Sequence, residues 1–259
     1  IKEKLTQVLK NPDVDLGAVE TMCVRKDGSN FPVEAYGKGI FYDGRIVRVI
    51  AIRDITEREK SDRDLQYRMD FENLITSLST SFINLEPEEI DEGIESGLQK
   101  IGEFAEVDRC FIALLSVTKK SMKAIYQWCT GDCSPVGSEL EHINESVLPW
   151  LFSRIKEREP KYIPNVKDLP PEAQKELTAI MPDGLVSAVF VPMIHGKSIK
   201  GVLGLHTTKK EKQWNEDIIV LLKIVGEIFV NALERKRALE ALQKANEDLE
   251  MKIEERTRE

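Results

Sequence analysis

The sequence predicts an α+β protein in which a central antiparallel sheet is flanked by helices and followed by a long helix. Two dense apolar runs, residues 187–194 and 199–207, flank the turn at 195–198 and predict a hairpin. Residues 55–83 contain neither Gly nor Pro, which predicts one continuous helix. From residue 218 onward, apolar side chains recur in a heptad pattern almost to residue 259.

The composition excludes several classes of function. Of 259 residues, 41% are hydrophobic and 32% charged, which supplies a core and leaves charge for exposed helices. The net charge of -8 argues against general binding of nucleic acid. The longest apolar run, residues 185–194, is half the roughly 20 residues of a membrane span. The charged opening residues do not resemble a signal peptide, and four cysteines are too few for a secreted disulfide scaffold. We therefore expect a cytoplasmic protein that does not insert into membranes.

The N-terminal region predicts a short amphipathic helix over residues 1–10, followed by three strands. The strands are expected at 19–25, 31–41 and 46–53, with turns at Asp27-Gly28 and Asp43-Gly44. Two consecutive hairpins give an antiparallel three-stranded meander.

Two motifs in this region carry a family resemblance. Residues 25–34 (RKDGSNFPVE) and 50–58 (IAIRDITER) resemble the C-terminal half of a PAS domain. In that family the Asp-Ile-Thr motif, here Asp54, Ile55 and Thr56, closes the last strand and leads into a signalling helix. The resemblance implies that residues 1–56 are part of a PAS domain and that 57–69 are the signalling helix. The front half of a PAS domain does not occur in this sequence, which puts a PAS ligand in doubt.

The middle of the chain alternates between helical and strand patterns. Strands are expected at 109–117, 122–128 and 161–163, with helices at 87–103 and 145–157. The motifs VDRCFIAL (107–114), AVFVPM (188–193), GVLGL (201–205) and Trp214 before the last helix follow in order. Together they resemble a GAF domain, which we place at residues 70–237.

The last helix carries the clearest periodic signal. Two tracks counted in sevens from Ile218 and Leu221 are mostly apolar over more than five heptads, which predicts a left-handed coiled coil. Asn246 at a core position favours a parallel dimer in fixed register. We expect residues 238–259 to be a coiled-coil linker to an output domain. The predicted dimer seam is Ile218, Leu221, Val225, Ile228, Ala232, Leu239, Leu242, Asn246, Leu249 and Ile253.

The GAF resemblance implies a pocket on one face of the sheet. The alternative is a pocket that the protein's own side chains fill and that binds nothing. The sequence identifies neither a ligand nor a cofactor. The expected lining is Ala113, Tyr126, Trp128, Leu148, Leu151, Val189, Leu205 and His206.

Two cysteines offer an alternative chemistry. Cys129 and Cys133 lie four residues apart in an expected loop and would form a disulfide if their backbones approached closely enough. The pattern of cysteine and histidine does not predict a metal site. Cys110, inside an apolar strand, is expected in the core.

These observations predict a sensory module without catalytic activity of its own. The resemblance implies a homodimer that senses a small ligand or partner and passes the signal through its helices to an output domain. Chains of this kind belong most often to histidine kinases, and also to diguanylate cyclases. The alternatives are a thiol-based redox sensor or enzyme using Cys129 and Cys133, and a dimerisation spacer without a ligand.

Overall fold

The computed structural model describes the chain except for residues 1–15, 117–120, 132, 134–142, 182–183 and 259. The chain divides into two compact units, Ile1–Asp70 and Phe71–Glu259, which we describe separately. The helix predicted over residues 1–10 and most of the loop predicted over 130–139 lie outside the described residues.

The first unit contains the predicted antiparallel meander. Strands β1 (Leu16–Val24), β2 (Asn30–Tyr42) and β3 (Arg45–Asp54) pair in the order β1-β2-β3. The β2–β3 turn places Asp43 at φ 48° and Gly44 at φ 76°. Two successive positive φ angles match the right-handed twist of the flanking strands, which explains the Asp-Gly pair. Helix α2 (Thr56–Asn84) follows directly and confirms the long helix expected there.

The second unit is built on a six-stranded sheet with every neighbouring pair antiparallel and the order β6-β5-β4-β9-β8-β7. Its strands are β4 (Arg109–Ser116), β5 (Ser121–Cys129), β6 (Ile143–Asn144), β7 (Lys161–Ile163), β8 (Ser187–His195) and β9 (Ser198–Thr207). The 3₁₀ turns are η1 (Pro87–Glu89) and η3 (Val166–Asp168). Its helices, besides the second half of α2, are α3 (Ile90–Phe104), α4 (Pro149–Lys156), α5 (Pro171–Ile180) and α6 (Glu216–Arg258).

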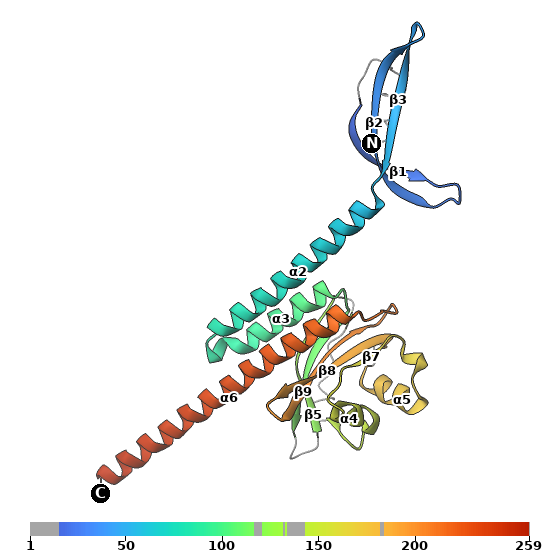
Figure 1. The fold of residues 1–259 in the computed structure, drawn as a ribbon. Coiled ribbons are helices and arrows are strands. Elements are labelled where there is room, and N and C mark those ends of the chain that lie inside the picture. Colours follow the sequence, from blue (N-terminus) through green and yellow to red (C-terminus); the bar gives the residue numbers. More distant parts are fainter. Residues whose placement is uncertain (1–15, 117–120, 132, 134–142, 182–183, 259) are drawn as a thin grey trace. The chain divides into compact units, whose positions relative to one another are not determined.

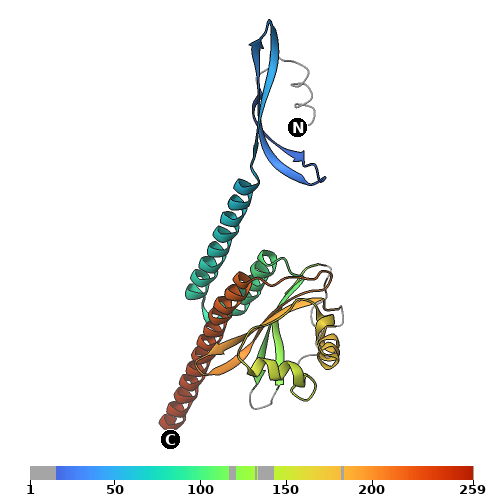
Figure 2. The same ribbon diagram turned by 45° about the vertical axis from the view of Figure 1, so that its right-hand side comes forward.

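The sheet separates two hydrophobic layers. Helices α3 and α6 cover one face, and α4 and α5 lie on the other side (Figures 1 and 2). The helix layer joins α2, α3 and α6 to residues such as Ile112, Val191 and Leu203. The second layer contains α4, α5 and the opposite face of the same strands. Both faces of the sheet are therefore buried.

Glycines allow aromatic rings to approach the helices closely in the first layer. A Cβ atom on Gly97 of α3 would lie 2.8 Å from the ring of Phe229 on α6, and one on Gly102 would lie 2.2 Å from the ring of Trp128. Such distances are impossible without movement, so these positions accommodate only glycine at the observed packing. The rings of Phe229 and Phe82 are 5.2 Å apart, which ties α6 to α2.

The start of α6 is fixed by a buried tryptophan. Trp214 Nε1 donates a hydrogen bond to Ser187 Oγ at 2.9 Å, and Asn215 Oδ1 accepts one from the Ile218 N–H at 3.1 Å. Ser187 Oγ in turn donates to the carbonyl of Ile163 at 2.9 Å. These bonds join the entry of α6 to strands β7 and β8. Within the described residues, none of the helices combines the length and apolarity that crossing a bilayer requires.

One helix differs from its predicted extent. The sequence pattern predicted a helix over 145–157, whereas α4 begins at Pro149. The short strand β6 (Ile143–Asn144) precedes it and pairs with β5. Proline is favoured in the first turn of a helix, because its missing N–H has no intrahelical partner there. Pro149 therefore marks the true start.

Candidate functional site

Successive residues of the central strands point to opposite layers. In β4, Cys110, Ile112 and Leu114 belong to the layer under α3 and α6. Phe111 and Ala113 belong to the layer under α4 and α5. This alternation is the ordinary period of two of a β-strand.

The layer under α4 and α5 encloses an apolar cavity. The cavity has a volume of about 30 Å³, space for about one or two water molecules. Its apolar lining offers a water molecule no polar partner, and the cavity is about a fifth of the roughly 150 Å³ that holds benzene, so a larger guest requires the lining side chains to move apart. Its lining consists of Phe111, Ala113, Met122, Ile143, Leu151, Ile155, Ile180, Met181, Phe190 and Val202.

A buried carboxylate positions the cavity wall. Glu176 of α5 accepts hydrogen bonds from the main-chain N–H groups of Trp150 and Leu151, at 2.9 and 3.1 Å. These N–H groups belong to the first turn of α4 and have no acceptor within that helix. A negative charge at the N-terminus of α4 also interacts favourably with the positive end of the helix dipole. Glu176 thus joins α5 to α4, and the two helices supply Leu151, Ile155 and Ile180 to the cavity.

The predicted pocket residues divide between the two layers. Ala113 and Leu151 line the cavity, and Leu148 is buried in the same layer. Tyr126, Trp128, Val189 and Leu205 belong to the opposite layer, against the helices. The two groups cannot line one cavity, because a strand residue and its neighbour face opposite sides. Phe190, one residue along β8 from Val189, lines the cavity instead, together with Phe111 of β4 and Val202 of β9.

A polar row crosses the cavity face at one end of three strands. Arg109 of β4 pairs in register with Cys129 of β5 on one side and with His206 of β9 on the other. Directly paired residues project on the same face of a sheet. Arg109 is 1% exposed and His206 is 0% exposed. The ring of His206 lies 6.1 Å from that of Phe111, a cavity residue.

Two sulfur atoms contact the buried guanidinium. Arg109 Nη2 lies 3.0 Å from Cys133 Sγ, and Nη1 lies 3.3 Å from Met181 Sδ. Cys133 is itself buried, while Cys129 is partly exposed. The sequence prediction named both cysteines but missed Arg109. An arginine at the head of an otherwise apolar strand was the available signal.

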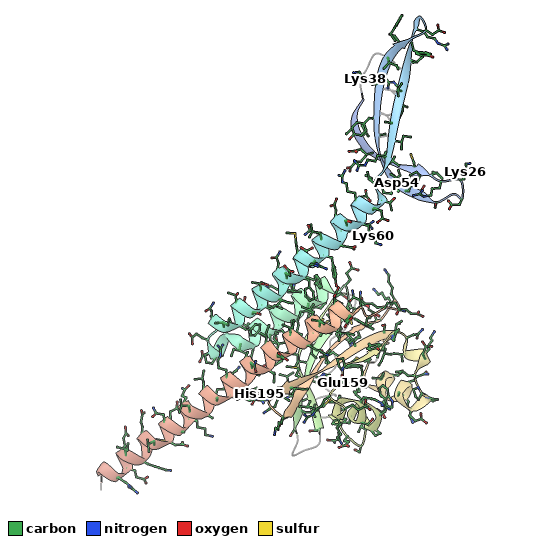
Figure 3. All side chains as sticks on the ribbon, viewed as in Figure 1. Lys26, Lys38, Asp54, Lys60, Glu159 and His195 are labelled. Carbon is green, nitrogen blue, oxygen red and sulfur yellow. The ribbon has the colours of Figure 1, made fainter. Side chains whose placement is uncertain are left out.

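The remaining predicted chemistry has clear placements. Cys110 is fully buried in the helix layer, as expected, and burial raises the pKa of its thiol. His195 is exposed at the end of β8, directly before the turn to β9 (Figure 3). Among the described residues, no three His, Cys, Asp or Glu side chains lie close enough together to hold a metal ion.

A second polar cluster joins the sheet to the helices on the other face. Asp91 of α3 accepts a hydrogen bond from the Tyr126 hydroxyl of β5 and another from Lys236 Nζ of α6, both at 2.6 Å. Burial opposes ionisation of Asp91, but these two bonds together hold its pKa below the ordinary value. Burial, then the bond to Asp91, raises the pKa of Tyr126.

The residues of the predicted α6 seam fall into a buried group and an exposed group. Ile218, Leu221, Val225 and Ala232 are buried against the domain's own sheet and helices, with Ile228 partly buried beside them. This corrects the prediction that these residues form a dimer seam, because packing within one domain uses the same spacing. The exposed fractions of Leu239, Leu242, Leu249 and Ile253 are 43%, 67%, 56% and 56%. Asn246 is also exposed and donates a hydrogen bond to Glu250.

The predicted relay motif lies where β3 meets α2 in the first unit (Figure 3). Asp54 Oδ1 accepts hydrogen bonds from the Thr56 hydroxyl and main-chain N–H, at 2.6 and 2.9 Å. Asp54 Oδ2 accepts one from Arg25 at 2.7 Å. The Thr56 bonds and then Arg25 lower the pKa of Asp54 to about 2. Ile55 is 2% exposed, and its N–H donates to the carbonyl of Pro32.

A six-stranded antiparallel sheet with helices on both faces and a cavity on one of them defines a small sensory-type domain. The GAF domain family model matches residues 89–233, and the chain belongs to that family.

A curated relative extends the likeness beyond this domain. The chain is 28% identical over 221 residues to the methanogenesis regulatory histidine kinase FilI of Methanothrix harundinacea (strain 6Ac). The match covers 81% of this chain and 24% of the relative, so the chain spans about a quarter of that protein.

Solved structures share the fold at low sequence identity. The chromophore-binding domain of the Stigmatella aurantiaca bacteriophytochrome (Thr289His mutant) has a TM-score of 0.54 at 14% identity, covering 89% of this chain and 76% of that one. The GAF domain of an Acinetobacter phosphoenolpyruvate-protein phosphotransferase has a TM-score of 0.51 at 13% identity, covering 64% and 93%. These likenesses establish the fold.

Proposed function

We propose that this chain is the sensory and relay region of a dimeric signal-transduction protein, a histidine kinase of a two-component system. The GAF cavity, which has a volume of about 30 Å³, opens by movement of its lining side chains to bind a small, uncharged and apolar ligand, and helices α2 and α6 carry the response to an output domain. The chain itself catalyses no reaction in this proposal, and it acts in the cytoplasm. The relative FilI, a regulatory histidine kinase, supports the class of parent protein.

One observation carries the proposal: the cavity and the output helix share the same two strands. In β8, Phe190 lines the cavity while Val191 and Met193 belong to the layer under α6. In β9, Val202 lines the cavity and Leu203 faces the helix layer. A ligand that displaces Phe190 or Val202 therefore moves strands on which α6 rests. A Cβ atom on Gly226 of α6 would lie 3.5 Å from Met193 Cγ, which supports direct contact between β8 and α6 at that point.

The helices are coupled to one another by charged contacts. Arg235 of α6 donates hydrogen bonds to the carbonyls of Phe82 and Leu85, at the C-terminus of α2. Lys236 of α6 forms an ion pair with Asp91 of α3. A shift of α6 on the sheet would therefore also move α2 and α3. For a large population change, the ligand must prefer one packing by several kcal/mol, about 5.5 for a swing from 1:99 to 99:1.

The exposed part of α6 supports dimerisation. Leu239, Leu242, Leu249 and Ile253 continue the heptad pattern where the helix no longer contacts its own sheet. In the proposal, two copies pack these residues together as a parallel coiled coil, with Asn246 fixing the register. The output domain would follow this coiled coil.

The first unit supports a PAS assignment. Its meander leads through the Asp54–Thr56 cap directly into α2, as the signalling-helix arrangement of that family implies. The sheet also leaves Phe41, Tyr42 and Ile52 exposed, at 77%, 66% and 60%. We propose that further PAS elements of the parent protein cover these side chains.

The six methionines of the chain allow one experiment to test sensing and relay together. Met122 and Met181 line the cavity, Met193 lies between β8 and α6, and Met251 lies on the exposed part of α6. The chain would be labelled with ¹³C at the methionine methyl groups and titrated with uncharged aromatic and branched aliphatic compounds no larger than indole. Xenon under pressure would report whether the cavity accepts an apolar guest at all.

The proposal predicts that a binding compound shifts the Met122 and Met181 signals together with those of Met193 and Met251. Met22 of β1 is exposed and serves as the internal reference. Shifts confined to Met122 and Met181 would overturn the relay. If neither xenon nor any compound moves those two signals, the cavity is not a ligand site and the spacer alternative holds.

A further inference from the structure

An apolar ligand would form no hydrogen bond with the polar row of Arg109, Cys129 and His206 at the edge of the cavity face. This edge places Cys133 in contact with the buried Arg109 and Cys129 opposite that arginine in strand register, and we infer that Cys133 is a peroxide-reactive thiolate with Cys129 as its disulfide partner. This inference does not depend on the ligand or on the dimer proposed above.

The first step of the argument is the contact between Cys133 and Arg109. Arg109 Nη2 lies 3.0 Å from Cys133 Sγ, and both side chains are buried, at 1% and 8% exposure. A guanidinium is always charged in proteins. Next to a sulfur atom it stabilises the thiolate, which is the nucleophilic form of cysteine. Burial opposes ionisation of a thiol, and the adjacent guanidinium offsets this cost, because few water molecules screen the two charges.

The second step is the position of Cys129. Its cross-strand pairing with Arg109 puts both side chains on the cavity face, with Cβ atoms expected about 4.5–5.5 Å apart. Between the cysteines the chain reverses direction, because the Cys133 N–H donates a hydrogen bond to the Thr130 carbonyl at 3.0 Å. Cys133 therefore returns toward the strand end that carries Cys129, whose cross-strand partner Arg109 contacts Cys133. All four cysteines of the chain lie among the described residues, and none of them is joined in a disulfide there.

The chemistry requires only a peroxide as oxidant. The Cys133 thiolate attacks one oxygen of hydrogen peroxide, so an S–O bond forms, the O–O bond breaks, and hydroxide leaves and is protonated to water. The product is a sulfenic acid on Cys133. Cys129 then attacks that sulfur, the S–S bond forms, and the second hydroxide leaves with the proton from the Cys129 thiol as water. Two thiols and one peroxide thus give one disulfide and two waters.

Oxidation of Cys133 would change the contacts of a residue that lines the cavity. The sulfur of a disulfide carries no negative charge, so Arg109 would lose its ionic contact with Cys133. The same guanidinium touches Met181, which lines the cavity. The thiol pair is thus a second input to the surface that the apolar ligand would occupy.

The other two cysteines are matched controls. Cys110 is the neighbour of Arg109 along β4 but faces the opposite layer and is fully buried. Cys23 lies on β1 of the first unit and is partly exposed, so it reports the reactivity of an ordinary accessible thiol. The inference requires Cys133 to react faster than both.

The test treats the reduced, purified chain with equimolar hydrogen peroxide and follows each cysteine by differential alkylation and peptide mass spectrometry. We expect Cys133 to be oxidised about tenfold faster than Cys23, as thiolate content governs the rate. The expected product is the Cys129–Cys133 disulfide. In Cys129→Ser, dimedone should trap sulfenic acid on Cys133, while Cys23→Ser should leave the disulfide yield unchanged.

A variant of the arginine tests the cause. Arg109→Gln removes the positive charge and should slow oxidation of Cys133 to the rate of Cys23, with Arg109→Lys in between. Because substitution of the buried Arg109 also perturbs folding, the rate of iodoacetamide alkylation against pH in the wild-type chain gives an independent test. Cys133 should reach its plateau at lower pH than Cys23. A Cys133 no faster than Cys23, or a disulfide that excludes Cys129, would overturn the inference.

Discussion

Arg235 of α6 donates a hydrogen bond to the main-chain carbonyl of Leu85, at 2.7 Å, immediately beyond the C-terminus of α2. The same guanidinium reaches the carbonyls of Phe82 and Ile83, at 3.0 and 3.3 Å. The last carbonyls of a helix accept no hydrogen bond from within that helix. A cation near them also interacts favourably with the negative end of the helix dipole. A residue that interrupts the apolar heptad pattern is therefore the link between two helices of the domain.

The first prediction concerns this link. Arg235→Ala should lower the free energy of unfolding of the second unit by about 1.5–3 kcal/mol, the range for hydrogen bonds to charged groups. Arg237→Ala, two residues further on, is the control, because Arg237 is exposed and forms an ion pair with Glu234 of the same helix. Urea unfolding followed by tryptophan fluorescence measures both, and equal losses in the two variants would contradict the capping role.

The second prediction concerns the pKa of Asp54. Its folded value of about 2 lies below the ordinary 3.8, so the stability it contributes is present above pH 4 and is lost as the pH falls toward 2. The hydroxyl of Thr56 is the largest cause, ahead of Arg25. At high salt, which screens the charge of Arg25, Thr56→Val should therefore raise the pKa of Asp54 more than Arg25→Gln does, as measured by carboxyl ¹³C NMR titration.

Asp27 provides the reference in the same samples. Its pKa is lowered chiefly by its bonds with Ser29, so Thr56→Val should leave it unchanged. The Arg25 pair is about half exposed, and added salt should weaken its effect on Asp54. A larger change from Arg25→Gln than from Thr56→Val would reverse the proposed order of causes.

The sequence predicted the elements of the fold better than the orientation of their side chains. Strand positions follow from dense apolar runs between turn residues, and β8 and β9 begin and end within a residue of their predicted limits. In β4, however, residues 109–114 are all buried, because helices cover both faces of the sheet. Such a strand shows no alternation of polar and apolar residues, so its two faces cannot be told apart from composition.

The same limit explains the misplaced pocket and seam residues. Val189 is apolar, as is its neighbour Phe190, and only the structure shows which of the two faces the cavity. In α6, a spacing of three and four residues is equally suited to a domain core and to a coiled coil. The exposed fraction separates these uses, since Val225 is buried and Leu242 is not.

The third prediction concerns Gly204 of β9. A Cβ atom there would lie 2.4 Å from the ring of Phe111, the cross-strand neighbour that lines the cavity. Gly204→Ala should force this ring to move and lower stability by about 1–3 kcal/mol, as overpacking does. Phe111→Leu in the same chain should recover part of the loss. Gly131→Ala, where nothing lies within 4 Å, is the control and should be nearly neutral in thermal unfolding.

The fourth prediction concerns the exposed stripe of α6. If Leu242 packs in a dimer, Leu242→Asp removes about 1.5–3 kcal/mol of apolar burial per chain. The dissociation constant should then rise by more than tenfold. Lys244→Gln changes the charge by the same single unit at an outer position of the same heptad. Sedimentation velocity over a range of concentrations distinguishes them, and a monomeric wild-type chain at the highest concentration would remove the basis for the coiled coil.

The fifth prediction concerns Asn246, which interrupts the apolar stripe between Leu242 and Leu249. A buried Asn at a core position costs stability but restricts register and oligomeric state. Asn246→Leu should therefore tighten self-association while admitting trimers or shifted registers, which native mass spectrometry resolves by mass. Asn246→Asp places like charges together and should weaken association instead. If both substitutions leave the association constant unchanged, Asn246 lies outside the interface, and the two copies must pair along another face of the helix.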